Sequence, residues 1–168
     1  MPKRRVLLVD DEVPVLLTMK AVLEISGFDV DTATSAREGK LRIKKNEYQM
    51  IITDMRMESD AAGQEVIQAA RNAPYHPAVA LLTAFPMSDE DWQDMGADKM
   101  LVKPMQTAQL IKQLEKLLEN HAAKLSRLSF AASGQDAAPR QAARKTARKV
   151  PGTTPPAELA QVQETSAQ

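Results

Sequence analysis

Residues 5–12 read RVLLVDDE, and this stretch decides the class of fold. An apolar run at positions 6–9 leads directly into Asp10, Asp11 and Glu12. A short apolar run without alternation is typical of a β-strand that is buried on both faces. Adjacent carboxylates repel each other, so acids at the end of a buried strand need a physical reason.

A strand followed by a helix recurs five times in the first 125 residues. Pro14 suits the first turn of a helix and Gly27 suits a helix C-terminus. Such alternation predicts an α/β fold, a doubly wound five-stranded parallel sheet with helices on both faces. We predict strands over 5–9, 28–33, 50–53, 78–83 and 99–102, and helices over 14–27, 35–46, 63–73, 88–96 and 107–125.

The composition limits the classes of protein to consider. The chain has 168 residues, enough for one ordinary domain and an extension. It contains no cysteine, which excludes disulfides, thiolate chemistry and cysteine-based zinc sites. The basic start has too few apolar residues for a signal peptide, and no apolar run reaches the roughly 20 residues that span a bilayer. We therefore expect a cytoplasmic protein with no membrane partner.

The C-terminal part of the chain has a different composition. Residues 126–168 are rich in Ala, Pro, Gln, Thr and Ser, so we expect a disordered Ala/Pro/basic tail after a domain at residues 1–125. Basic side chains within 140–149 recur at helical spacing and could bind nucleic-acid phosphates if this segment were helical. No aromatic side chain accompanies them for base stacking, so a solvated basic linker is the favoured interpretation.

Chemically active side chains stand where four predicted strands end. The carboxyl ends of parallel strands lie at one edge of the sheet, where ligands bind in such folds. Carboxylates gathered there need a counter-ion, and a hard cation such as Mg²⁺ takes oxygen ligands. A lysine and a hydroxyl nearby suit a phosphoryl group. Each residue alone is most often a turn former, a helix cap or a strand end, but their joint placement favours a functional site made by Asp10, Asp11, Asp54, Thr83 and Lys103.

Four segments resemble the signature of response-regulator receiver domains. They read VLLVDDE, IITDMRM, LLTA and LVKP, at residues 6–12, 51–57, 81–84 and 101–104, and the likeness extends over about 4–120. The resemblance implies a flavodoxin-like (βα)5 receiver fold with strand order 2-1-3-4-5. It also implies a single-domain response regulator of a bacterial two-component phosphorelay, with the tail in place of an output domain.

The resemblance assigns a metal site and a phosphoacceptor. Asp54 is the expected phosphoacceptor, which takes a phosphoryl group from a sensor histidine kinase or a phosphotransfer protein. Asp11, Asp54 and the backbone carbonyl of Arg56 are expected to coordinate Mg²⁺ directly, and Asp10 is expected to act through water. The protein is then a phosphoacceptor, with at most weak self-catalysed phosphorylation and dephosphorylation, and an unknown downstream protein receives the signal.

The resemblance also implies a switch. Lys103 would pair with the phosphoryl oxygens, and Thr83 would reorient to bond the phosphoryl group. Pro104 is expected to follow a cis peptide bond. The family usually has an aromatic side chain at the switch position that Met100 occupies. A flexible Met either loosens the coupling to the output face or fills the same gap.

Other residues near the site also depart from the family pattern, and some are expected to affect how long the acyl phosphate lasts. Glu58 replaces a common Pro, in a loop about one residue longer than usual. The interval between the strand-end Thr and Lys is about two residues short, so we expect a trimmed fourth helix, with Trp92 in the core. Ala84, Phe85 and Arg56 surround the expected acyl phosphate, and our hypothesis is that Arg56 and Phe85 shield it from water and lengthen its life.

Three other functions remain open. A phosphatase of the dehalogenase type also uses an aspartate after a strand, but it needs an acid two residues on, where Arg56 stands. A receiver-like scaffold that is never phosphorylated would not need the complete set of site residues. A regulator that binds nucleic acid would use the basic stripe at 140–149.

Overall fold

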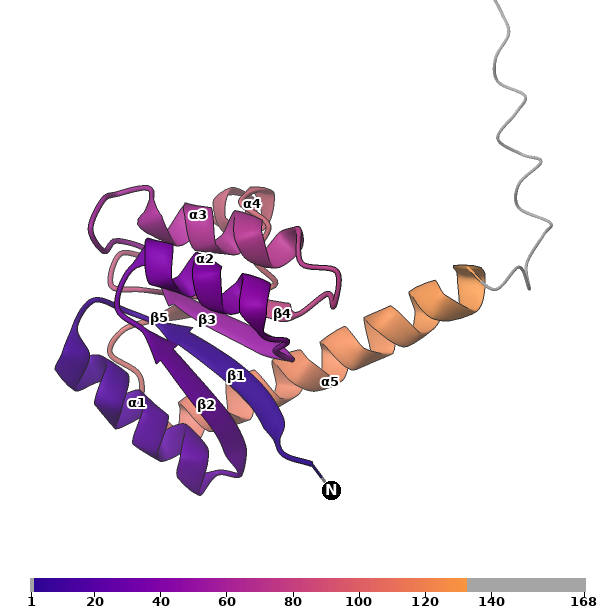
Figure 1. The fold of residues 1–168 in the computed structure, drawn as a ribbon, viewed down its shortest axis with the longest axis horizontal. Coiled ribbons are helices and arrows are strands. Elements are labelled where there is room, and N and C mark those ends of the chain that lie inside the picture. The colour runs from indigo at the N-terminus through magenta and orange to yellow at the C-terminus, as the bar shows by residue number, and fades with distance from the viewer. Residues whose placement is uncertain (1, 133–168) are drawn as a thin grey trace, which may run out of the picture. The chain divides into compact units, whose positions relative to one another are not determined.

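The computed structural model describes residues 2–132, which form alternating strands and helices (Figure 1). All neighbouring strands are parallel, in the order β2-β1-β3-β4-β5, which confirms the predicted five-stranded doubly wound fold. Within the described residues, no helix has both the length and the apolar character needed to cross a membrane. The elements are β1 (Arg4–Val9), α1 (Val13–Ile25), β2 (Phe28–Ala33), α2 (Ala36–Lys45), β3 (Met50–Asp54), α3 (Ala62–Arg71), β4 (Ala78–Thr83), α4 (Asp89–Asp94), β5 (Lys99–Val102) and α5 (Thr107–Ala132).

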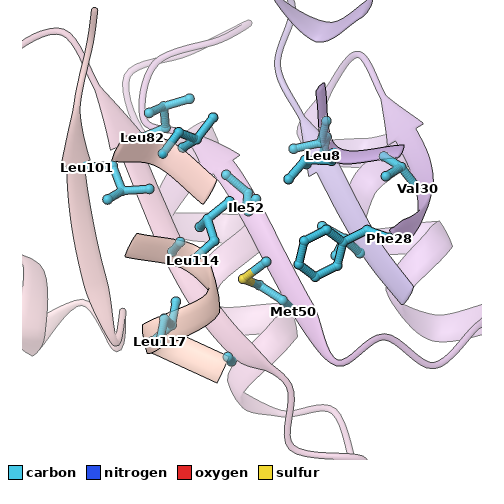
Figure 2. Packing of buried hydrophobic residues seen from close by; sticks show 14 of the residues in the cluster. Leu8, Phe28, Val30, Met50, Ile52, Leu82, Leu101, Leu114 and Leu117 are labelled. Atoms are coloured by element: carbon cyan, nitrogen blue, oxygen red, sulfur yellow. The ribbon is translucent and has the colours of Figure 1, made fainter. Parts of the chain in front are cut away.

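Each face of the sheet has its own apolar cluster, because successive side chains of a strand point to opposite faces. Val6 and Leu8 belong to the cluster that β-strand residues form with α1 and α5. Leu7 and Val9 belong to the cluster formed with α2 and α3. Figure 2 shows the first cluster, which includes Leu114 of α5. Burial on both faces explains why β1, β3 and β4 contain continuous apolar runs.

Both ends of α1 and the start of α2 lie close to where the sequence signals predict them. Pro14 is in the first turn of α1, and Gly27, with a positive φ of 99°, follows its C-terminus. Ser35 caps α2, since its hydroxyl oxygen accepts a hydrogen bond from the backbone N–H of Glu38. These ends determine how the connections lead away from the strands.

The fourth helix is short, as predicted. It has six residues, none of which is buried. Trp92 is half-buried and packs against the cluster under α3, so the expected core position is only partly reached. The Trp92 indole N–H donates to the Asp89 carboxylate at 3.1 Å, which explains why the ring stays near the surface.

The last helix is longer than predicted. We predicted a helix over 107–125 that stops at about 126, but α5 continues to Ala132, so the predicted end of this helix is wrong. Four of the seven residues in 126–132 are strong helix formers, namely Arg127, Leu128, Ala131 and Ala132, and intrinsic propensity continues the helix where the apolar periodicity ends. Residues 133–168, which include the basic stripe at 140–149, lie outside the described residues.

Candidate functional site

Three carboxylates meet at the carboxyl edge of the sheet. Asp10 and Asp11 follow β1, and Asp54 is the last residue of β3, where it pairs with Leu82 of β4. One carboxylate oxygen from each of the three acids lies within 4.8 Å of the other two. Asp10 and Asp54 are buried, with 3% and 9% of their surface exposed, whereas Asp11 is exposed. The structure therefore brings together the acids that the sequence places at the strand ends.

Lys103 forms ion pairs with the two buried acids of this group, Asp10 and Asp54. Its ammonium nitrogen lies 3.1 Å from Asp10 Oδ2, 3.3 Å from Asp54 Oδ1 and 3.8 Å from Glu12 Oε1. The lysine side chain is itself largely buried, so solvent screens the two shorter contacts only weakly. The sequence suggested only that Glu12 favours the start of α1, and the contact with Lys103 is an additional finding.

Burial and ion pairing shift the pKa values of Asp54 and Lys103 in opposite directions. Burial raises the pKa of Asp54, and the neighbouring Asp10 carboxylate adds to this, although Lys103 pulls the pKa down in part. Burial alone would lower the pKa of Lys103, but hydrogen bonding and attraction from Asp10 and Asp54 outweigh it and raise that pKa. Asp54 is thus a more basic carboxylate than one in water, and Lys103 is firmly protonated.

The donor set at this edge fits a hard divalent cation. The three acids offer only carboxylate oxygens, the ligands that Mg²⁺ prefers. Lys103 supplies one positive charge against three carboxylates, so a net negative charge remains near a buried group. A divalent cation would neutralise that excess. The role of the Arg56 backbone carbonyl as a further ligand stays a prediction.

Thr83 lies at the same edge, with its hydroxyl directed to the following loop. The backbone N–H of Phe85 donates to Thr83 Oγ1 at 3.0 Å, and that hydroxyl donates to the Phe85 carbonyl at 3.2 Å. Within the described residues, no hydrogen bond joins Thr83 to Asp54 or Lys103 through its hydroxyl. The backbone N–H of Lys103 does donate to the Thr83 carbonyl at 2.8 Å, which aligns the ends of β4 and β5.

The expected tuning residues lie around this edge. The guanidinium carbon of Arg56 is 5.1 Å from the centroid of the Phe85 ring, a cation–π contact, and Phe85 is 64% exposed. Ala84 is exposed, and Met100 is half-buried on β5. The peptide bond between Lys103 and Pro104 is cis, as predicted. Arg56 and Phe85 are thus in contact with each other, and their shielding of the site stays a prediction.

Gly63 determines how closely α3 approaches the end of β3, and the sequence analysis did not single it out. Its N–H donates to the Met55 carbonyl at 2.9 Å. A Cβ atom at this position would lie 2.5 Å from the carbonyl oxygen of Asp54 and 2.6 Å from Met55 Cα. Glycine is well tolerated near a helix start, so its presence there gave no distinctive signal of this close backbone approach.

Comparison with known proteins agrees with this geometry. The model of the response regulator receiver domain matches residues 6–115. The chain belongs to the response regulator receiver domain family. It is 31% identical over 123 residues to the regulatory protein VanRB of Enterococcus faecalis, covering 71% of this chain and 54% of VanRB. The chain thus spans about half the length of VanRB.

Solved receiver structures share the fold. The chemotaxis response regulator CheY4 of Vibrio cholerae superposes with a TM-score of 0.63 and 29% identity, over 69% of this chain and 99% of CheY4. The response regulator TrrA of Thermotoga maritima, solved in complex with Mg(2+)-BeF, superposes with a TM-score of 0.61 and 28% identity, over 68% of this chain and 98% of TrrA. The chain is therefore similar to response regulators in both sequence and fold.

Replacing Gly63 by Ala should displace the backbone of Asp54 and Met55. Because the added methyl group collides with backbone rather than with a flexible side chain, we expect a loss of about 2 kcal/mol in the free energy of unfolding and weaker Mg²⁺ binding. Urea denaturation and calorimetric Mg²⁺ titration measure the two effects. Gly27→Ala is the control, because it strains a positive φ in open space. Equal Mg²⁺ affinity in both variants would contradict the prediction.

Replacing Asp54 by Asn should increase the free energy of unfolding at about pH 7 in the presence of a chelator, while Lys103 keeps Asp10 as its partner. The pKa of Asp54 is raised in the folded state, so the stability that this carboxyl group contributes is present below its unfolded pKa and is lost as the pH rises through its folded pKa. The increase in the free energy of unfolding that Asp54→Asn gives over the wild type should therefore become smaller as the pH falls toward about 4. Urea denaturation across this pH range would show it, and a constant gain would refute the argument.

Proposed function

We propose that the protein is a phosphoacceptor response regulator of a two-component phosphorelay, which receives a phosphoryl group on Asp54. The observation that carries the proposal is the buried Asp54 carboxylate, which lies beside two further carboxylates and in contact with Lys103. The proposed donor is a sensor histidine kinase or a phosphotransfer protein. The proposed recipient of the signal is a downstream protein that contacts the receiver domain, for which we propose residues 1–125.

Four groups would hold Mg²⁺ in this proposal. Asp11, Asp54 and the backbone carbonyl of Arg56 would bind it directly, and Asp10 would act through water. Both oxygens of Asp10 already have partners, because Lys103 donates to one and the backbone N–H of Glu12 donates to the other. That engagement supports the indirect role of Asp10. When bound, Mg²⁺ would supply positive charge that neutralises the incoming phosphoryl group.

The side chains of the site then prepare phosphoryl transfer by position and charge. Asp54 provides the nucleophilic oxygen: a bond forms between it and phosphorus while the bond from phosphorus to the donor's leaving atom breaks. Burial makes this carboxylate more basic than one in water, which favours attack. Lys103, already 3.3 Å from Asp54 Oδ1, can follow the negative charge onto the phosphoryl oxygens. Such a site also permits weak self-catalysed phosphorylation and dephosphorylation.

Thr83 would convert phosphorylation into a change of shape. To bond the phosphoryl group, its hydroxyl has to leave the backbone N–H and carbonyl of Phe85. The released segment is exposed and carries Ala84 and Phe85. Phosphorylation would thus bias this loop between two arrangements, with the half-buried Met100 of β5 as the proposed switch position.

Two other functions are compatible with particular features of the chain. A scaffold that is never phosphorylated would share the fold, and it is disfavoured by the contact of Lys103 with Asp54, which phosphoryl binding needs. A regulator that binds nucleic acid would depend on residues 140–149. Salt-dependent DNA binding that disappears on truncation would favour that second function.

Incubation of the full chain with Mg²⁺ and a small phosphodonor such as acetyl phosphate should add the mass of one phosphoryl group to the wild type. Asp54→Asn should gain nothing, and a chelator should abolish the gain, because both the nucleophile and the neutralising charge are required. Asp60→Asn, which removes an exposed acid of the neighbouring loop, is the control and should keep the mass gain. A wild-type protein without added mass would favour the scaffold.

Phe85→Ala and Arg56→Asn should each shorten the life of the phosphorylated form by several fold, because each removes one half of the cation–π contact that we propose shields the acyl phosphate. The double variant should decay more slowly than the product of the two single effects predicts, since either change alone already breaks the contact. Loss of phosphoryl mass with time measures the rate. Ile25→Ala, on the exposed end of α1, serves as the control. Unchanged decay in both single variants would refute shielding.

A further inference from the structure

The loop between β3 and α3 is tied to α2 by Glu58. Both carboxylate oxygens of Glu58 lie within hydrogen-bond distance of the backbone N–H of Ala36, at 2.9 Å and 3.2 Å. Ala36 is the first residue of α2 and is separated from Glu58 by 22 positions in the chain. The contact therefore joins the loop that follows Asp54 to α2, the helix that connects β2 to β3.

The hydrogen bonds at the start of α2 show why an acid from outside the helix fits there. The first N–H groups of a helix lack partners within the helix. Ser35 Oγ accepts from the N–H of Glu38 at 3.1 Å, and Glu38 Oε1 accepts from the N–H of Thr34 at 2.7 Å. The N–H of Ala36 is satisfied by Glu58. A carboxylate at this position is also favoured by the positive end of the helix dipole.

The helix α2, which Glu58 contacts, is itself packed against β1 and joined to α3. Gly39 of α2 packs so closely on β1 that a Cβ atom there would lie 3.1 Å from Val9 Cγ2. Lys40 Nζ lies 2.8 Å from Glu65 Oε1, which joins α2 to α3. The helix is thus a fixed support, and Glu58 is the side chain by which the loop reaches it.

The loop itself has little other support on its outer side. The side chains of Arg56 and Asp60 are 61% and 95% exposed, and their mutual contact is long, at 3.9 Å. Met57 N–H donates to the Ser59 carbonyl at 3.3 Å, which is a bond within the loop. On its inner side, Met55 and Met57 pack against the apolar cluster under α2 and α3. The exposed outer part would sample several conformations if Glu58 did not attach it to α2.

We infer that Glu58 is a positioning residue: by capping α2 it holds the Asp54–Arg56 segment in the conformation that binds Mg²⁺ and accepts a phosphoryl group. This inference rests on the proposed function and deepens it, because it assigns a role to a residue outside the site. Glu58 acts through the backbone of the loop, and it is two residues from Arg56, whose carbonyl is a proposed ligand. Attachment raises the population of the binding conformation, and apparent affinity scales with that population.

Mg²⁺ affinity of the full chain, measured by calorimetry without phosphodonor, tests the role of Glu58. Glu58→Ala should bind Mg²⁺ about fivefold more weakly, the size expected for loss of one helix-capping hydrogen bond. Glu58→Gln keeps a carbonyl oxygen that can accept from Ala36, so its affinity should stay within about twofold of the wild type. Asp60→Ala is the matched control, because it removes an acid of the same loop that forms an ion pair with Arg56 and, within the described residues, no hydrogen bond or ion pair with α2.

The effect of Mg²⁺ on amide hydrogen exchange at Ala36 is a second measurement. If Glu58 only stabilised the helix, Mg²⁺ would not change the exchange rate of this N–H. Coupling between two sites is reciprocal, so Mg²⁺ should slow exchange of the Ala36 N–H in the wild type and have little effect on it in Glu58→Ala. Urea denaturation in a chelator checks that all variants remain folded. This control separates weaker binding by a folded protein from simple loss of structure.

Three outcomes would overturn the inference. They are wild-type affinity in Glu58→Ala, an equal loss in Asp60→Ala, and a loss in Glu58→Gln as large as that in Glu58→Ala. The first denies any role, and the other two would assign the effect to charge near the site instead of the hydrogen bond. A wild-type protein that binds Mg²⁺ but gains no phosphoryl mass would refute the proposed function and leave the Mg²⁺ role of Glu58 standing. The two failures are therefore distinguishable.

Discussion

The site depends on an imbalance of charge, in which one ammonium group faces three carboxylates at the carboxyl edge of the sheet. Burying a carboxylate is unfavourable unless it is paired, and Lys103 pairs with both buried acids, Asp10 and Asp54. The lysine can do this only because a parallel sheet brings the ends of β1, β3 and β5 to one edge. The remaining negative charge makes the edge receptive to a cation, and this answers why adjacent acids follow the first strand.

The sequence predicts this edge well because two simple rules determine it. Apolar runs locate the strands, and strict alternation with helices makes the strands parallel, so Asp54, Thr83 and Lys103 have to lie near Asp10. Contacts that depend on the path of a loop were not predicted. Gly63 packs against the backbone of Asp54 and Met55 across the turn before α3. Glu58 accepts a hydrogen bond from Ala36, which is 22 residues away in the sequence. No local sequence pattern indicates either contact.

The end of α5 was missed for a different reason. Apolar periodicity reports which helix face packs on the sheet, and it ends where packing ends, near Leu125. Helix propensity does not require packing, so a segment in which Arg127, Leu128, Ala131 and Ala132 are strong helix formers can remain helical to Ala132. Periodicity therefore underestimates the length of a helix that continues past its packed part, and the same pattern that predicts the fold correctly predicts this boundary wrongly.

The two loops that flank Asp54 differ in how firmly they are attached. The loop after β3 is joined to α2, which buries Ala36, Gly39 and Ile43 against the sheet and α3. The loop after β4 leads into α4, which buries no residue, and its contact with Thr83 consists of two hydrogen bonds to one exposed residue. Rearranging the second loop disrupts less packing than rearranging the first. A change that begins at Asp54 should therefore move the β4–α4 side, while the α2 side keeps the site in shape.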